Sequence, residues 1–84
     1  MKLLRIGFGN AVVPSRLKQI QAVKASDRRH WRKNVGHMIK MIDATAGRQT
    51  RSMLIMDSGH IILSSMTPES LEQRLHELLQ TKKE

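Results

Sequence analysis

Two glycine-containing turns divide the middle of this chain and constrain its fold more than any other feature. Ala46-Gly47 ends one short apolar run and Asp57-Ser58-Gly59 ends the next, so Met41–Leu63 contains three such runs. Glycine adopts the positive φ that tight turns need, and Asp and Ser stabilise turns through their side chains. This pattern predicts a meander of three antiparallel strands. Arg48 and Arg51 follow the first turn, so we expect them to project from the rim of the sheet.

Helices are predicted on both sides of this meander. Ser26 as N-cap and Asp27 in the first turn favour a helix over Asp27–Lys40. One apolar face of that helix, expected in the core or at a subunit interface, would carry Trp31, Val35, Met38, Ile39 and Ile42. Thr67-Pro68-Glu69 predicts the start of a second helix, over Pro68–Gln80.

Two further strands are predicted before the first helix, over Lys2–Gly7 and Leu17–Val23. Eighty-four residues suffice for one domain. The sequence thus predicts a single α+β domain over residues 1–84, with a small antiparallel sheet and two helices in the order ββαβββα. A chain of this length without cysteine has only a modest core to stabilise it, which favours oligomerisation.

Positive charge is concentrated in the first part of the chain. Residues 1–51 contain 12 Lys or Arg and 2 acids, whereas residues 52–84 contain 3 Lys or Arg and 5 acids. A pI near 11 with such asymmetry is typical of polyanion binders, although a generic basic surface is the alternative. Phe8 and Trp31 are the only aromatic residues, too few for the base-stacking surfaces of single-strand binders. Duplex DNA held by its phosphates is therefore the expected partner.

The first predicted helix has a strongly basic face. Four cations fall within six positions of it, namely Arg28, Arg29, Arg32 and Lys33. They repel one another, and an anionic partner would relieve that repulsion. Auxiliary contact with DNA and an ordinary solvated surface are equally compatible with this pattern.

No pattern of catalytic or metal-binding residues is present. The four histidines are dispersed, and none belongs to a His-Glu-x-x-His arrangement. We expect Asp57 to cap its own turn, and Asp43 either to orient a nearby arginine or to be a simple surface acid. The sequence predicts no enzyme activity, no metal and no cofactor. It contains no apolar segment long enough to span a membrane, so a cytoplasmic location is expected.

Several motifs occur together along residues 3–75. They are Ile6-Gly7-Phe8-Gly9-Asn10, Arg16, Ile42-Asp43-Ala44-Thr45, Gly47-Arg48, Thr50-Arg51, Met56–Ser64, and Pro68-Glu69 with Arg74. In combination they resemble the RemA family of small bacterial regulators of extracellular matrix genes. The resemblance implies a nucleoid-associated, DNA-binding transcription regulator of matrix and biofilm genes. It also implies a LytTR-like subunit and a ring-shaped homo-oligomer, an octamer, with DNA on its outer surface.

The resemblance also implies which residues bind DNA. They are Arg16, Arg48 and Arg51, expected to lie together, with Gln49 on the same turn. Gln49 departs from the family, whose members commonly have a second basic residue after the glycine. Ala25-Ser26-Asp27 likewise replaces a proline-rich entry to the first helix. The alternative function is a non-catalytic structural or adaptor protein that binds RNA or an acidic protein.

Overall fold

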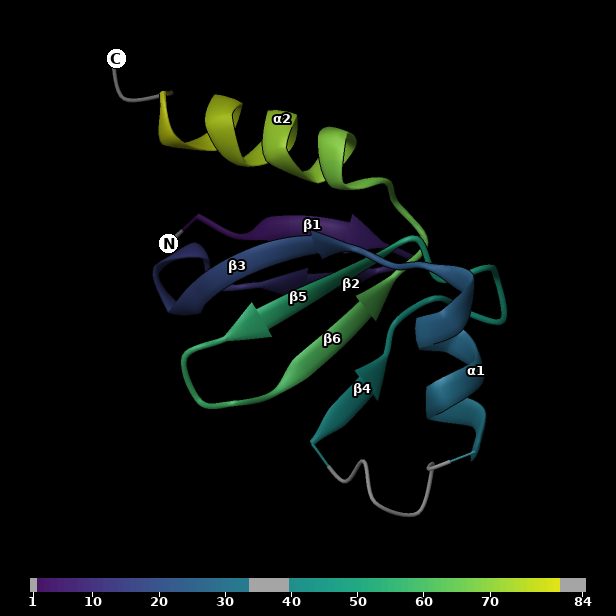
Figure 1. Ribbon diagram of the computed structural model, residues 1–84. Helices are drawn as coiled ribbons and strands as arrows, with labels where there is room; N and C mark the ends of the chain where they lie inside the picture. Colours follow the sequence, from purple (N-terminus) through teal and green to yellow (C-terminus); the bar gives the residue numbers. More distant parts are fainter. Residues whose placement is uncertain (1, 34–39, 81–84) are drawn as a thin grey trace.

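The described part of the protein is a small α+β structure with two helices and two sheets (Figure 1). The computed structural model describes residues 2–33 and 40–80. The elements in chain order are β1 (Leu4–Gly7), β2 (Asn10–Val12), a 3-10 turn η1 (Pro14–Arg16), β3 (Leu17–Ala22), α1 (Ala25–Lys33), β4 (Met41–Asp43), β5 (Ser52–Met56), β6 (Ile61–Ser64) and α2 (Pro68–Leu79). Three strands rather than the predicted two therefore precede α1.

The additional strand is β2, which pairs antiparallel with β1 in a two-stranded sheet of their own. No strand was predicted between Gly7 and Leu17. Gly7, Phe8 and Gly9 all have positive φ, and they reverse the chain tightly enough for Val12 to pair with Leu4. The apolar run after the turn thereby becomes a strand.

The second sheet has four strands in the order β3-β5-β6-β4. The predicted hairpin between β5 and β6 is confirmed, but the predicted meander is wrong. β4 pairs with the far edge of β6, parallel to it, and β3 pairs antiparallel with β5. The loop between β4 and β5 carries the chain past the end of β6, so that β5 lies on the opposite side of β6 from β4. The sheet is consequently mixed and not wholly antiparallel.

Helix α1 begins two residues earlier than predicted. The Asp27 carboxylate accepts a hydrogen bond of 3.0 Å from the backbone N–H of Lys24, so the acid caps the helix from inside its first turn. The predicted end at Lys40 is wrong, because Lys40 lies in a turn and Ile42 belongs to β4. The predicted apolar positions Val35, Met38 and Ile39 lie outside the described residues.

Helix α2 follows the prediction closely. Thr67 is its N-cap and accepts a hydrogen bond of 3.2 Å from the Ser70 N–H, with Pro68 at the first helical position. It ends at Leu79, one residue before the predicted end. The helix lies over β1 and β3 and buries Leu71 completely (Figure 1). Neither helix in the described ranges is long and apolar enough to cross a bilayer.

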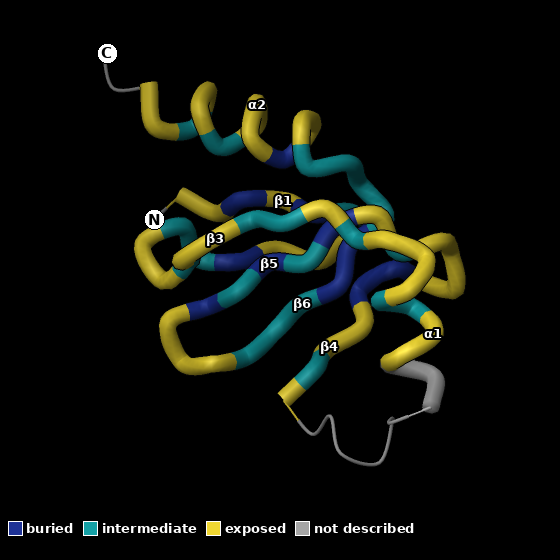
Figure 2. Tube along the Cα trace, viewed as in Figure 1, coloured by how far each residue is buried: buried dark blue, intermediate teal, exposed yellow. Residues whose placement is uncertain are grey.

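The core lies where α2, the β1–β2 hairpin and the four-stranded sheet meet, as the dark segments of Figure 2 show. Its buried members are Leu4, Ile6, Val12, Ala44, Leu54, Met56 and Leu71. Ser64, which is fully buried, joins the two sheets: its Oγ donates to the Ile6 carbonyl at 2.9 Å and accepts from the Met66 N–H at 3.1 Å. This serine therefore fixes the hairpin to the end of β6.

Candidate nucleic-acid interface

A tight turn presents Arg48 between β4 and β5. The Arg48 N–H donates to the Thr45 carbonyl at 2.9 Å. The two central residues, Ala46 and Gly47, have φ of 52° and 82°, the combination found in type I′ turns. The start of the turn is fixed by Asp43, whose Oδ1 accepts from the Thr45 N–H at 2.9 Å and from the Thr45 hydroxyl at 2.6 Å. Asp43 therefore stabilises the turn. It was expected either to orient a nearby arginine or to be a simple surface acid, and the structure supports neither role.

The exposed Arg48 side chain lies against an aromatic ring. Its guanidinium carbon is 5.4 Å from the centroid of the Phe8 ring, within the range of a cation–π contact. Phe8 comes from the tip of the β1–β2 hairpin and is 51% exposed. Two turns that are 40 residues apart in sequence therefore meet at one end of the molecule.

Arg51 lies at the same end, immediately before β5. Its N–H donates to the Ser64 carbonyl at 2.9 Å, and its carbonyl accepts from the Val23 N–H at 3.0 Å. The backbone of Arg51 is thus held between the ends of β6 and β3, while its side chain is exposed. Gln49, between Arg48 and Arg51, is exposed as well.

Helix α1 contributes further arginines to this end. Arg28 is half-buried, and its Nη1 donates to the Thr50 carbonyl at 2.9 Å. Arg29, the next residue, is exposed. The side chains of Arg32 and Lys33 lie outside what the structure describes. The main and the auxiliary predicted sites are therefore adjacent, and we call Arg28, Arg29, Arg48 and Arg51 the basic end.

Arg16 does not belong to the basic end. Its carbonyl accepts from the Asp57 N–H at 2.8 Å, and its Nη1 lies 3.4 Å from Asp57 Oδ2. Asp57 follows β5 whereas Arg51 precedes it, so the length of that strand, about 17 Å at 3.3 Å per residue, separates Arg16 from Arg51. Within the single chain, the expectation that Arg16 lies with Arg48 and Arg51 is wrong.

The ion pair also changes the interpretation of Asp57, which was expected to cap its own turn. The side chain that bonds within that turn is Ser58, whose Oγ lies 2.7 Å from His60 Nδ1. Asp57 instead faces Arg16, and the two side chains are 43% and 70% exposed. Ion pairs this exposed contribute at most about 1 kcal/mol, so Arg16 remains available to a stronger anionic partner.

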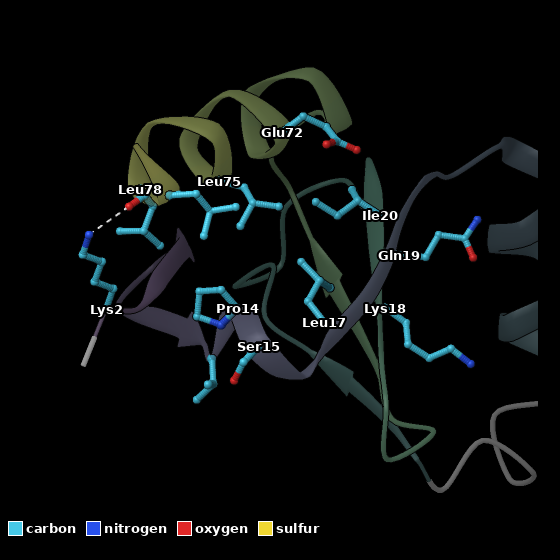
Figure 3. Close-up of a pocket in the computed structure, with 12 residues that line it drawn as sticks. Lys2, Pro14, Ser15, Leu17, Lys18, Gln19, Ile20, Glu72, Leu75 and Leu78 are labelled. Carbon is cyan, nitrogen blue, oxygen red and sulfur yellow. Dashed lines mark hydrogen bonds between the residues drawn. The ribbon is translucent and has the colours of Figure 1, made fainter. Parts of the chain in front are cut away.

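A groove of about 600 Å³ runs between α2 and the η1–β3 segment (Figure 3). Its lining is mostly apolar and includes Val13, Pro14, Leu17, Ile20, Leu75 and Leu78. At one end the Lys2 Nζ donates to the Leu78 carbonyl at 3.2 Å, as the dashed line shows. In the ranges that the structure describes, no group of three or more His, Cys, Asp or Glu residues could hold a metal ion, in this groove or elsewhere. Apolar side chains suit the groove better than a polyanion does.

Phe8 is the residue at this interface that the sequence did not identify. It was included in a family motif and counted as one of two aromatic residues, too few to stack bases, and it was given no role in binding. A signal existed nonetheless, since a large ring between two glycines is a costly residue for a turn that needs only small ones.

Comparison with known proteins agrees with the resemblance seen in the motifs. Residues 3–75 match the family described as RemA-like, Extracellular matrix regulatory protein A-like. A protein of Dictyoglomus turgidum named "Putative regulatory protein" is 43% identical over 75 residues, which cover 89% of this chain and 88% of that protein. A similarly named protein of Desulfotalea psychrophila is 44% identical over 75 residues, covering 89% of this chain and 67% of its own length.

A third relative, from Shouchella clausii and again named as a regulatory protein, is 40% identical over 76 residues, 90% of this chain and 87% of that one. The matched range extends from before β1 to the middle of α2 and contains every described residue of the basic end. The chain belongs to the RemA-like family, whose name indicates a regulatory role.

Proposed function

We propose that this protein is a non-catalytic transcription regulator that binds duplex DNA through the basic end. The observation that carries the proposal is the convergence of α1 and the β4–β5 loop, joined by the bond between Arg28 and the Thr50 carbonyl. That convergence gathers Arg28, Arg29, Arg48 and Arg51 on one surface. Arginine is well suited to phosphate because its planar guanidinium donates two parallel hydrogen bonds.

The carboxylates near this surface do not neutralise it. Asp27 is bonded to the Lys24 N–H and Asp43 to Thr45, so both accept from the chain's own backbone and not from an arginine. The two carboxylates keep their negative charges, but they are outnumbered by the four arginines, and in the described ranges neither forms an ion pair with Arg29, Arg48 or Arg51. Phosphate contacts supply most of the salt-dependent affinity of such proteins for DNA.

One subunit offers few phosphate contacts, so the proposal includes a homo-oligomer. By family resemblance it is an octameric ring of LytTR-like subunits acting at extracellular matrix and biofilm genes. The apolar groove along α2, with Leu79 65% exposed at its margin, offers a surface for a neighbouring subunit. Repetition of a weak site around a ring multiplies its affinity through avidity.

A ring also explains how Arg16 could take part in binding although it lies far from Arg51 in its own subunit. In a head-to-tail ring, opposite ends of neighbouring subunits meet. Arg16 of one subunit would then lie beside Arg48 of the next. The DNA-binding set that the family resemblance implies would be complete only in the assembly.

The test is a titration of a labelled duplex by fluorescence anisotropy at several salt concentrations, beside a measurement of solution mass. We expect binding whose affinity falls steeply with salt, weaker competition by single-stranded RNA of the same length, and a mass of several subunits. Lack of duplex binding at low salt, or preference for the RNA, would favour the adaptor function. A mass near 9.6 kDa, that of a single chain, at micromolar concentration would exclude the ring.

A further inference from the structure

We propose that Phe8 is a positioning residue of the basic end: its ring holds the Arg48 guanidinium in the orientation that meets a DNA phosphate. The inference rests on the proposed function and adds to it a residue outside the arginine set. It starts from two observations that are independent of charge, namely the backbone conformation of Phe8 and its exposure.

The backbone at Phe8 is strained. Its φ is 55°, in the left-handed region that bulky side chains rarely adopt, and Gly7 and Gly9 on either side have φ of 106° and 78°. The Asn10 side chain compensates for this strain, because its Nδ2 donates to the Gly7 carbonyl at 3.2 Å and to the Phe8 carbonyl at 3.3 Å. Glycine or asparagine would occupy this φ at lower energy. The presence of phenylalanine therefore points to a role for its ring.

The ring does not serve the core. Phe8 is 51% exposed and lies outside the buried cluster formed by the hairpin, the sheet and α2. The partner that the structure gives it is the Arg48 guanidinium, 5.4 Å from the ring centroid. A contact between an exposed ring and an exposed cation, at the tips of two separate turns, contributes little to holding the fold. It restricts where the cation lies.

That restriction matters because arginine loses much rotamer freedom when it binds. A guanidinium already held on a ring loses less conformational entropy when it meets phosphate, so the same contact yields a tighter complex. The type I′ turn fixes the backbone of Arg48, and Phe8 fixes the far end of its side chain. Arg51, whose backbone is held by β3 and β6, has no such ring contact among the described residues, and it provides an internal control.

The experiment compares three variants of Phe8 by duplex titration. Phe8→Leu keeps an apolar side chain but removes the aromatic face, and Phe8→Asn suits the left-handed backbone. We expect both to weaken binding about two- to fivefold for each engaged subunit, the range of an exposed cation–π contact, without reducing thermal stability. Phe8→Tyr, which keeps the aromatic face, should retain wild-type affinity. The salt slope should be unchanged in all three, because no charge is lost.

A double-mutant cycle separates positioning from a structural effect. Phe8→Leu should lose its effect when Arg48→Ala is already present, and keep it in the Arg51→Ala background. An equal loss in both backgrounds, or wild-type affinity of Phe8→Leu itself, would overturn the positioning role while leaving duplex binding intact. Wild-type protein that does not bind duplex DNA would instead overturn the proposed function, and the positioning role with it.

Discussion

The same substitution should affect the stability of the fold differently at two adjacent arginines of α1. From the sequence, Arg28 and Arg29 are equivalent members of one basic face. In the structure, Arg28 is half-buried and bonded to the Thr50 carbonyl, whereas Arg29 is exposed. Replacement of either residue by methionine removes one charge and hardly changes helix propensity, because Met and Arg rank together. Comparing the two variants therefore isolates the contribution of the hydrogen bond between Arg28 and the Thr50 carbonyl.

The size of the stability loss follows from the charge of the Arg28 donor and from its partial exposure. Hydrogen bonds with one charged partner contribute about 1.5–3 kcal/mol, and partial exposure of Arg28 reduces this to about 1–2 kcal/mol. Arg28→Met should lower the free energy of unfolding by that amount, and the unfolding temperature by about 4–8 °C per kcal/mol. Arg29→Met should change the free energy of unfolding by less than about 0.5 kcal/mol. Both variants should bind duplex DNA less tightly, but only Arg28→Met should also release the β4–β5 loop.

The assay is urea unfolding followed by circular dichroism, with all proteins at one concentration because association adds to apparent stability. Proteolysis at the arginines of the β4–β5 loop gives a second measurement, since a released loop is cleaved faster. Equal unfolding curves for Arg28→Met and Arg29→Met would refute the reasoning. They would show that the bond between Arg28 and Thr50 does not connect α1 to the loop in solution.

Three other outcomes are expected. Arg48→Ala should weaken binding to all duplexes alike and reduce the salt slope by about one unit per engaged subunit, as measured by titrations at several salt concentrations. An unchanged slope with intact assembly would contradict a phosphate contact by Arg48. Gln49→Arg should tighten duplex binding and steepen its salt dependence, because a charge-assisted phosphate contact is gained; affinity and slope equal to wild type would mean that this turn faces away from DNA. Ser64→Ala should destabilise the fold by about 2–4 kcal/mol in chemical denaturation, because the Ile6 carbonyl and the Met66 N–H both lose their hydrogen-bond partner. A loss below about 1 kcal/mol would show that Ser64 does not join the two sheets.

Local signals in the sequence predicted the local structure well. Thr67-Pro68 predicted the start of α2, and Asp57-Ser58-Gly59 predicted the β5–β6 hairpin. These features depend on neighbouring residues, because an N-cap or a glycine turn acts within a few positions. The same holds for the turn that carries Arg48.

The pairing of distant strands could not be predicted in this way. Periodicity shows that Met41–Asp43 is apolar but does not say which strand it joins, and consecutive strands are neighbours only about two-thirds of the time. The structure places β3 against β5, which leaves β4 the outer edge of β6. The misplacement of Arg16 has the same origin, because its neighbours are set by the β3–β5 pairing and not by distance along the sequence.

The contacts that hold the N-terminal hairpin come from residues that are synthesised much later. The Ser64 hydroxyl meets the Ile6 carbonyl across 58 positions, and Arg74 Nη1 lies 3.4 Å from the Arg5 carbonyl across 69. At a synthesis rate of about 5–20 residues per second, β1 lacks its β6 partner for about 3–12 s after it is made.

A two-stranded hairpin is marginally stable without such a partner, so Leu4, Ile6 and Val12 stay exposed to water during that interval. The Ser64 contact that fixes the hairpin, which carries Phe8 at its tip, can form only after β6 has been synthesised. The N-terminal hairpin is therefore expected to become stable only after α2 has been synthesised and packs against β1.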